Sequence, residues 1–311
     1  MSTPTKLIAF LVGLAAVFAG SVGAGALVPQ VMEGGTPDAG AHDAGHTTGT
    51  ASAEETESRP PGGLMISDHG YTLALSDDAL QAGDAVRLGF SILGPDGAPV
   101  TEYTETHDKD LHLIVVRRDM TGFQHVHPIL DADGDWSVPL SLEPGQWRVF
   151  VDFTPGGEEE NLTLGADLAV AGDYRPQQLP AASSSAEVDD YTVHLDGKLV
   201  PGRESKLTLT VTRAGEPVTD LQPYLAAYGH LVALRDGDLA YLHVHPAGSP
   251  GDGTTKAGPA ITFYATAPSS GDYRLFLDFR HRGTVRTAEF TAHAGKNSGH
   301  RPEEEDAGHG H

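Results

Sequence analysis

The chain of 311 residues contains no cysteine. This absence excludes disulfides, thiolate metal ligands and a cysteine nucleophile. It also excludes a lipid anchor that requires a cysteine at the cleavage point. Methionine and tryptophan are scarce, with four and two residues. Any metal site must therefore be built from histidine, carboxylate, methionine or backbone ligands.

Basic residues are also few. The chain has 20 Lys and Arg against 43 Asp and Glu, which gives a formal net charge of −23. Nucleic acids and anionic membrane surfaces are bound by basic patches, so this composition argues against both as partners. The surplus of carboxylates attracts cations, and it is equally expected of a soluble protein with a generally acidic surface.

The sequence has a single long apolar run, which spans residues 7–28 and follows Lys6. Its 22 residues suffice to span a bilayer and exceed the usual core of a cleaved signal peptide. We therefore expect residues 1–30 to be a retained membrane anchor. The alternative is a signal peptide cleaved near Ala24-Gly25-Ala26. Both place the rest of the chain outside the cytoplasm, either tethered to the cell membrane or secreted.

Helical periodicity is absent after the N-terminal run, so an all-β fold is expected. Short alternating segments recur with turn signals between them, and Gly70–Leu75 resembles Asp190–Leu195. This pattern predicts two tandem immunoglobulin-like β-sandwiches, at residues 64–172 and 188–292. The remaining segments are predicted to be a disordered stalk (31–63), a linker (173–187) and a histidine-containing disordered tail (293–311).

A histidine pattern occurs twice. Pro99–Pro128 aligns without a gap on Pro217–Pro246, and ten of the thirty positions are identical. In each copy one histidine precedes a His-Val-His-Pro motif by 13 residues, and the six histidines are His112, His125, His127, His230, His243 and His245. Chance does not keep three histidines in one register twice, so we infer an internal duplication.

The spacing predicts a hairpin with all three histidines on one face, because residues two apart in a strand share a face. In the first copy His112 is expected opposite His127. In the second, His230 is expected opposite His245 or His243. Three imidazoles at cross-strand distance suit Cu(II) or Zn(II). The residues His107 and Asp110 precede only the first triplet, so we expect them to supply extra ligands there.

Two alternatives stay open for these polar residues. The histidine face also carries apolar residues such as Ile114 and Val232, so the histidines could be structural hydrogen-bonding groups at the end of a core. Asp152 and Asp278 recur in aromatic strands. Each could orient a ligating imidazole, or pair with Arg148 or Arg274.

No enzyme is predicted. The sequence lacks a nucleophile elbow, a phosphate loop, an HExxH motif and a repeated Ser-His-Asp order.

The two hairpins resemble those of exported, membrane-anchored bacterial heavy-metal-associated proteins and of YtkA-like extracytoplasmic β-sandwich domains. The stretches that carry the resemblance are His112–Pro128 and Gly229–Pro246. The resemblance implies copper handling at the cell envelope, with the six hairpin histidines as ligands.

We therefore expect an extracytoplasmic metal-binding protein that carries a copper ion, or a zinc ion as the alternative. Its expected partners are the metal ion, the membrane through the N-terminal helix, and an envelope metal transporter. The competing hypothesis is a metal-free tandem module that docks an envelope partner and uses its histidines structurally.

Overall fold

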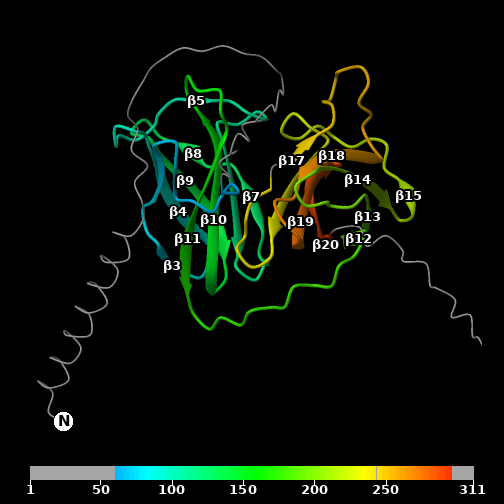
Figure 1. The fold of residues 1–311 in the computed structure, drawn as a ribbon, viewed down its shortest axis with the longest axis horizontal. Helices are drawn as coiled ribbons and strands as arrows, with labels where there is room; N and C mark the ends of the chain where they lie inside the picture. Colours follow the sequence, from blue (N-terminus) through cyan, green and yellow to red (C-terminus); the bar gives the residue numbers. More distant parts are fainter. Residues whose placement is uncertain (1–59, 243, 296–311) are drawn as a thin grey trace, which may run out of the picture. The chain divides into compact units, whose positions relative to one another are not determined.

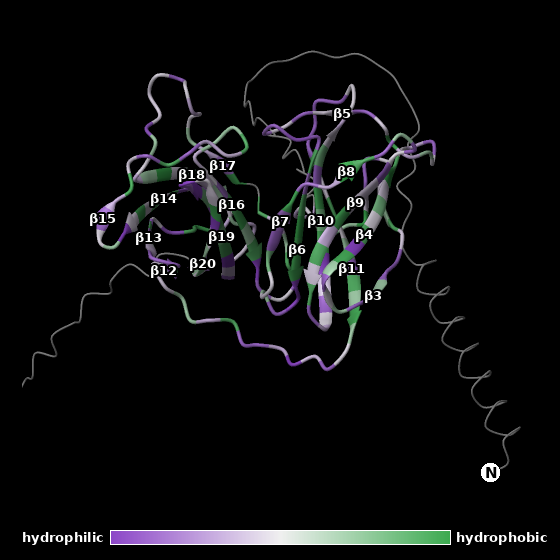
Figure 2. Ribbon diagram, turned by 180° about the vertical axis from the view of Figure 1, so that it is seen from behind, coloured by the Kyte–Doolittle hydropathy of each residue, from purple (hydrophilic) through white to green (hydrophobic). Residues whose placement is uncertain are grey.

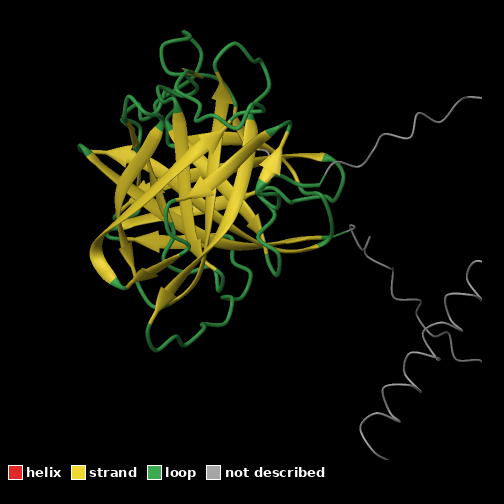
Figure 3. Cartoon of the chain, turned by 90° about the vertical axis from the view of Figure 1, so that its left-hand side faces the viewer, coloured by secondary structure: helices red, strands yellow, loops and turns green. Residues whose placement is uncertain are grey.

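A computed structural model describes residues 60–242 and 244–295, which all belong to one compact unit. The predicted anchor or signal, most of the stalk, His243 and the tail from residue 296 lie outside the described residues. Within the described part every regular element is a strand, so the all-β prediction is confirmed (Figure 3). The same part contains no helix with the length and apolar character needed to cross a bilayer.

Two sheets make up the first sandwich (Figure 1). One has the order β1 (Ser67–Asp68), β2 (Tyr71–Leu75), β4 (Gly83–Leu93), β9 (Asp135–Leu142), β8 (Ile129–Leu130). The other has the order β3 (Ala79–Gln81), β11 (Leu162–Ala171), β10 (Gly145–Pro155), β6 (Leu111–Arg117), β7 (Gln124–Val126), with β5 (Tyr103–Thr104) beside β10.

The second sandwich repeats this plan with a smaller second sheet. Its larger sheet has the order β12 (Ser185–Val188), β13 (Tyr191–Asp196), β14 (Glu204–Arg213), β18 (Ala260–Thr266), β17 (Val244–Pro246), with β15 (Glu216–Pro217) beside β14. Its smaller sheet has the order β16 (Gly229–Arg235), β19 (Gly271–His281), β20 (Thr284–Ala294). The last strand therefore extends two residues into the segment that we predicted as tail.

Alternation of apolar and polar residues explains each sandwich core, because successive side chains of a strand point to opposite faces. In β14, Leu207, Leu209 and Val211 are buried, whereas the residues between them are more exposed. They pack against Leu275 and Leu277 of the opposite sheet. Figure 2 shows the corresponding hydrophobic stretches on strands such as β6 and β10.

Strand β6 departs from this alternation because all seven of its residues are buried. Leu113 and Val115 face the core of their own sandwich. Ile114 and Val116 face the other way and pack against the second sandwich. We call the resulting cluster the shared core; it consists of Ile114, Val116, Met120, Phe150, Val232, Leu234, Leu239 and Phe276.

The segment that leads into the first sandwich is held on both sides. The backbone N–H of Tyr241 donates to the Gly62 carbonyl at 3.0 Å, and the Gly63 N–H donates to the Thr163 carbonyl at 2.8 Å. The Arg148 guanidinium also donates to the Gly63 carbonyl, at 2.6 Å. Residues 60–63, which we expected to belong to the disordered stalk, are thus fixed by backbone hydrogen bonds.

The shared core generates a stability prediction. Phe276 is fully buried, and its ring stacks on Phe123 of the first sandwich with centroids 4.0 Å apart. The substitution Phe276→Ala should lower the free energy of unfolding by about 3–5 kcal/mol, because it removes a large buried side chain. Urea unfolding measures this loss. The control Ile129→Ala, at a side chain that is 76% exposed, should change it by less than about 0.5 kcal/mol. Equal effects would mean that the shared core contributes no stability.

Candidate metal centre

The hairpin formed by β6 and β7 positions the first histidine triplet. Leu113 pairs with Val126, Ile114 with His125, and Val115 with Gln124. This is the predicted register, and it carries His112 and His127 to opposite positions on the face that His125 shares. The tip is fixed by Asp119, whose carboxylate accepts hydrogen bonds from Arg117 Nε and Thr121 Oγ1.

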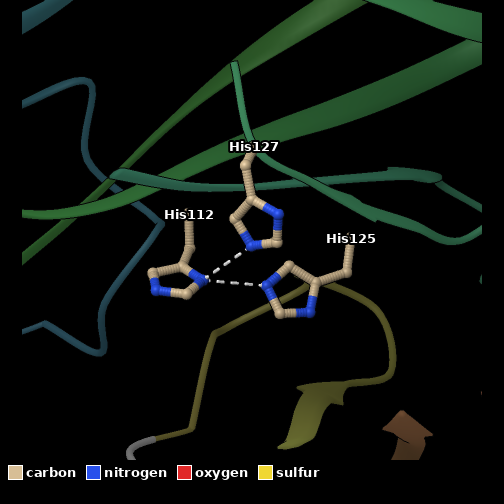
Figure 4. A group of neighbouring side chains, drawn as sticks. All are labelled: His112, His125 and His127. Atoms are coloured by element: carbon tan, nitrogen blue, oxygen red, sulfur yellow. Dashed lines mark hydrogen bonds between the residues drawn. The ribbon is translucent and has the colours of Figure 1, made fainter. Parts of the chain in front are cut away.

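The three imidazoles converge on one point (Figure 4). His112 Nδ1 lies 3.1 Å from His125 Nε2 and 3.2 Å from His127 Nε2. One nitrogen from each ring lies within 4.8 Å of the other two. Two nitrogens bonded to the same ion at about 2.0–2.1 Å in tetrahedral geometry lie about 3.3 Å apart, so this spacing suits a metal ion.

Hydrogen bonds on the outer nitrogens fix the tautomers of two rings. His112 Nε2 lies 3.0 Å from the Thr106 carbonyl oxygen, which can only accept, so Nε2 carries the proton. His125 Nδ1 donates in the same way to Asp278 Oδ2 at 2.8 Å. In the neutral rings, His112 Nδ1 and His125 Nε2 therefore both present lone pairs, and these face each other. A cation or an added proton between them relieves that repulsion. His127 Nε2, at 3.2 Å, can also donate to His112 Nδ1 if it carries the proton, but this bond leaves the lone pair of His125 Nε2 facing the same nitrogen.

Burial disfavours the added proton. Burial, together with the charge of a protonated His125, lowers the pKa of His112 to about 3. Burial likewise lowers the pKa of His127 to about 4, again with a contribution from His125. Both rings are therefore neutral at physiological pH and available as ligands.

A cavity of about 400 Å³ adjoins two of the three rings. His112 and His125 line it together with His107, His230 and Asp152. Burial lowers the pKa of His230 to about 4, and its Nε2 donates to the carbonyl oxygens of Tyr224 and Leu225. The polar part of the cavity is thus rich in imidazole.

The two extra residues expected at the first site are not among the converging ligands. His107 and Asp110 are exposed. The ring of His107 lies 6.2 Å from that of His112 and 5.3 Å from that of His230, measured between centroids. Its backbone has a positive φ of 53°, which turns the loop before β6. Their role as ligands stays a prediction.

The second triplet is arranged differently from the first. His230 lies on β16, whereas His245 lies on β17, which pairs with β18 of the other sheet. Near the turn the hairpin keeps the predicted register, since Leu234 forms a bridge with Tyr241, but from Val244 the chain pairs with β18, so the expected pairing of His230 with His245 is wrong. The ring of His245 instead stacks on Tyr264, with centroids 5.6 Å apart. His243 lies outside the described residues, so the ligand role of this triplet stays a prediction.

The hydrogen bonds of the two repeated aspartates involve groups other than the arginines that we considered as their partners. Asp278 accepts from His125 and from Thr287 Oγ1, at 2.8 and 2.6 Å. Asp152 accepts from Asn161 and Thr163. Arg148 pairs with Asp167, and Arg274 with Glu289. One aspartate therefore orients an imidazole, but the imidazole belongs to the other sandwich.

Sequence reasoning missed two partners of the triplet. Nothing in the sequence indicates that the Thr106 carbonyl fixes His112. The second partner is Asp278 of the other sandwich. The nearly continuous apolar run in the segment Leu111–Arg117 is the sequence signal that could have indicated a covered outer face there.

Two of the solved structures to which the chain is similar are distant likenesses. The adhesin FdeC of Escherichia coli is 16% identical over 74% of this chain and 65% of its own, with a TM-score of 0.23. Invasin, a bacterial integrin-binding protein, is 12% identical over 73% of this chain and 40% of its own, with a TM-score of 0.23. The present chain thus spans less than two thirds of either protein. Scores this low carry no conclusion about activity or partners.

No curated protein matches the chain at a significant level. A family model described as a domain of unknown function, DUF8832, matches residues 66–170 and 186–296. The two matched segments contain the strands of the first and second sandwich, respectively, and together they make up more than half of the chain. The protein therefore belongs to the DUF8832 family.

Proposed function

We propose that the protein binds one transition-metal ion through His112, His125 and His127. The observation that carries the proposal is the pair of facing lone pairs, His112 Nδ1 and His125 Nε2, 3.1 Å apart. Each ring is held in this tautomer by an acceptor on its other nitrogen. A metal ion satisfies both lone pairs at once, and the lowered pKa values of His112 and His127 make a proton the weaker competitor.

Copper is the ion that we favour, with zinc as the alternative. Neutral imidazole suits both ions, and no thiolate is available to select a softer one. The role is binding and transfer, with no catalysis by the protein itself. The resemblance of the hairpins to exported copper-handling proteins points to the cell envelope, with an envelope metal transporter as the partner.

We also infer that the two sandwiches are immunoglobulin-like and arose by duplication. The repeated histidine pattern supports this, as do the two separate segments that match one family model. The apolar run at residues 7–28 supports membrane attachment or export.

The competing function is a metal-free module that docks a partner. His230 supports a structural role for at least one histidine, because its Nε2 donates to the backbone carbonyls of Tyr224 and Leu225. The two functions differ in ion binding, which can be measured directly.

We expect the full-length chain to bind one Cu²⁺ or Zn²⁺ tightly, as measured by equilibrium titration against a competing chelator. The substitution His127→Ala should weaken binding by at least about 100-fold, because it removes a direct ligand, and loss of an outer partner alone costs 10–100-fold. His42, His46, His300, His309 and His311 should first be replaced by Asn, so that terminal histidines do not bind the ion.

His245→Ala is the matched control, because His245 occupies the corresponding position of the second copy and lines the same cavity, but its ring stacks on Tyr264 and is not one of the converging ligands. It should leave the affinity unchanged. A chain that binds neither ion would favour the docking function. Equal affinities of the two variants would remove the first triplet as the site.

Proton uptake gives a separate prediction for the ion-free protein. The folded state keeps His112, His127 and His230 neutral down to about pH 4, whereas in the unfolded chain they take up protons near pH 6.5. The unfolded state thus binds more protons in this window, so stability is present above pH 6.5 and is lost as the pH falls towards 4. Each such histidine contributes up to about 1.4 kcal/mol per pH unit.

The substitution His230→Gln should make this pH dependence shallower by up to one proton, because glutamine does not titrate and its amide can still donate to the Tyr224 carbonyl. Urea unfolding at several pH values between about 7 and 4.5 measures the slope. An unchanged slope would mean that His230 is charged in the folded protein.

A further inference from the structure

A carboxylate from the second sandwich touches a ligand of the first. Asp278 lies on β19, where its register partner is His230 of its own sandwich. Its Oδ2 nevertheless accepts the hydrogen bond from His125 Nδ1, at 2.8 Å. The two side chains are 5% and 4% exposed, so this contact is closed to water. Thr287 Oγ1 donates to the other carboxylate oxygen at 2.6 Å and holds the group in place.

The contact decides which nitrogen of His125 faces the triplet. With the proton on Nδ1, the lone pair of Nε2 points at His112 Nδ1. In the other tautomer, Nε2 would carry the proton and donate it to His112 Nδ1 across the same 3.1 Å. That bond would satisfy both rings and close the site to a cation. The Asp278 carboxylate disfavours this tautomer, because its buried Oδ2 would then lose the donor and face the lone pair of His125 Nδ1, while Thr287 still serves only the other oxygen. It also raises the basicity of the ligating nitrogen.

We propose that Asp278 is a positioning residue that the second sandwich contributes to the metal site of the first. The ion site is therefore incomplete without the second sandwich, and ion binding depends on the packing between the two halves. This inference rests on the proposed function, since it concerns the same three ligands.

Asp152 provides a matched comparison within the chain. It lies opposite His112 in β10, as Asp278 lies opposite His230 in β19. Each aspartate also pairs across its sheet with a threonine, Thr163 or Thr287. The hydrogen bonds of Asp152 go to Asn161 and Thr163, whereas those of Asp278 include an imidazole. The two positions thus share their setting in the sheet and differ in the contact with His125.

The test compares Asp278→Asn with Asp152→Asn in the full-length chain, with Cu²⁺ as the probe ion. Asp278→Asn should raise the dissociation constant by 10–100-fold, whereas Asp152→Asn should change it by less than about threefold. Thr287→Val retains the carboxylate and loses its anchor, so a smaller increase of about 3–10-fold is expected. This variant keeps the proposal testable if Asp278→Asn does not fold.

A second readout follows the tautomer itself, which a merely structural role would not alter. In the ion-free protein labelled with ¹⁵N at histidine, long-range proton–nitrogen spectra should show His125 protonated at Nδ1. Asp278→Asn should shift part of the population to protonation at Nε2. Equal affinities of Asp278→Asn and Asp152→Asn, with the tautomer unchanged, would overturn the inference.

The two hypotheses fail in different ways. A wild-type chain that binds no Cu²⁺ overturns the proposed function. A wild-type chain that binds it, with an Asp278→Asn variant that binds equally well, overturns only the contribution of Asp278.

Discussion

Apolar packing between the outer faces of β6 and β16 is the interaction on which the candidate site depends. Ile114 and Val116 of the first sandwich meet Val232 and Leu234 of the second in the shared core. Because His112 occupies the same face of β6, two residues before Ile114, this packing also covers His112, which is 8% exposed. The same packing brings Asp278 within hydrogen-bond distance of His125. An isolated hairpin would leave these imidazoles in water.

Exclusion of water gives the site its chemistry. A buried imidazole has no solvent to stabilise its charge, so burial is the largest cause of the lowered pKa of His112 and of His127. Neutral rings retain their lone pairs, and acceptors at Thr106 and Asp278 fix where two of these lone pairs point. The apolar packing therefore determines two properties of the ligands: it keeps the buried rings neutral, and it brings Asp278 to His125, where it fixes the tautomer. A metal ion would meet donors that are already oriented, and only His127 would have its tautomer set by the ion.

The sequence was sufficient to predict the all-β class and the register of the first hairpin. Both follow from period-two patterning, which is a local property of the chain. It was insufficient for the contact between Asp278 and His125, because 153 residues separate them and the strand register alone pairs Asp278 with His230. The alternatives for Asp278 concerned its own sandwich. Contacts between the two halves depend on which sheet faces meet, and the period-two pattern of a single strand does not specify its partner across the interface.

The two copies of the His-Val-His-Pro motif are placed differently because the chain crosses to the opposite sheet at different points. In the first copy, β7 stays on β6 through Val126, and the Gln124 amide forms two hydrogen bonds with the backbone of Ser141 in β9. The second copy has Leu242 in place of Gln124, and this side chain is buried in the sandwich core. From Val244 the backbone itself pairs with β18. The Gln124 amide thus pairs with the backbone of β9, so the backbone of β7 can stay paired with β6 beside His112. A leucine side chain cannot form these hydrogen bonds. The three histidines of the first copy therefore meet in one sheet, whereas in the second copy His245 lies on the sheet opposite to that of His230.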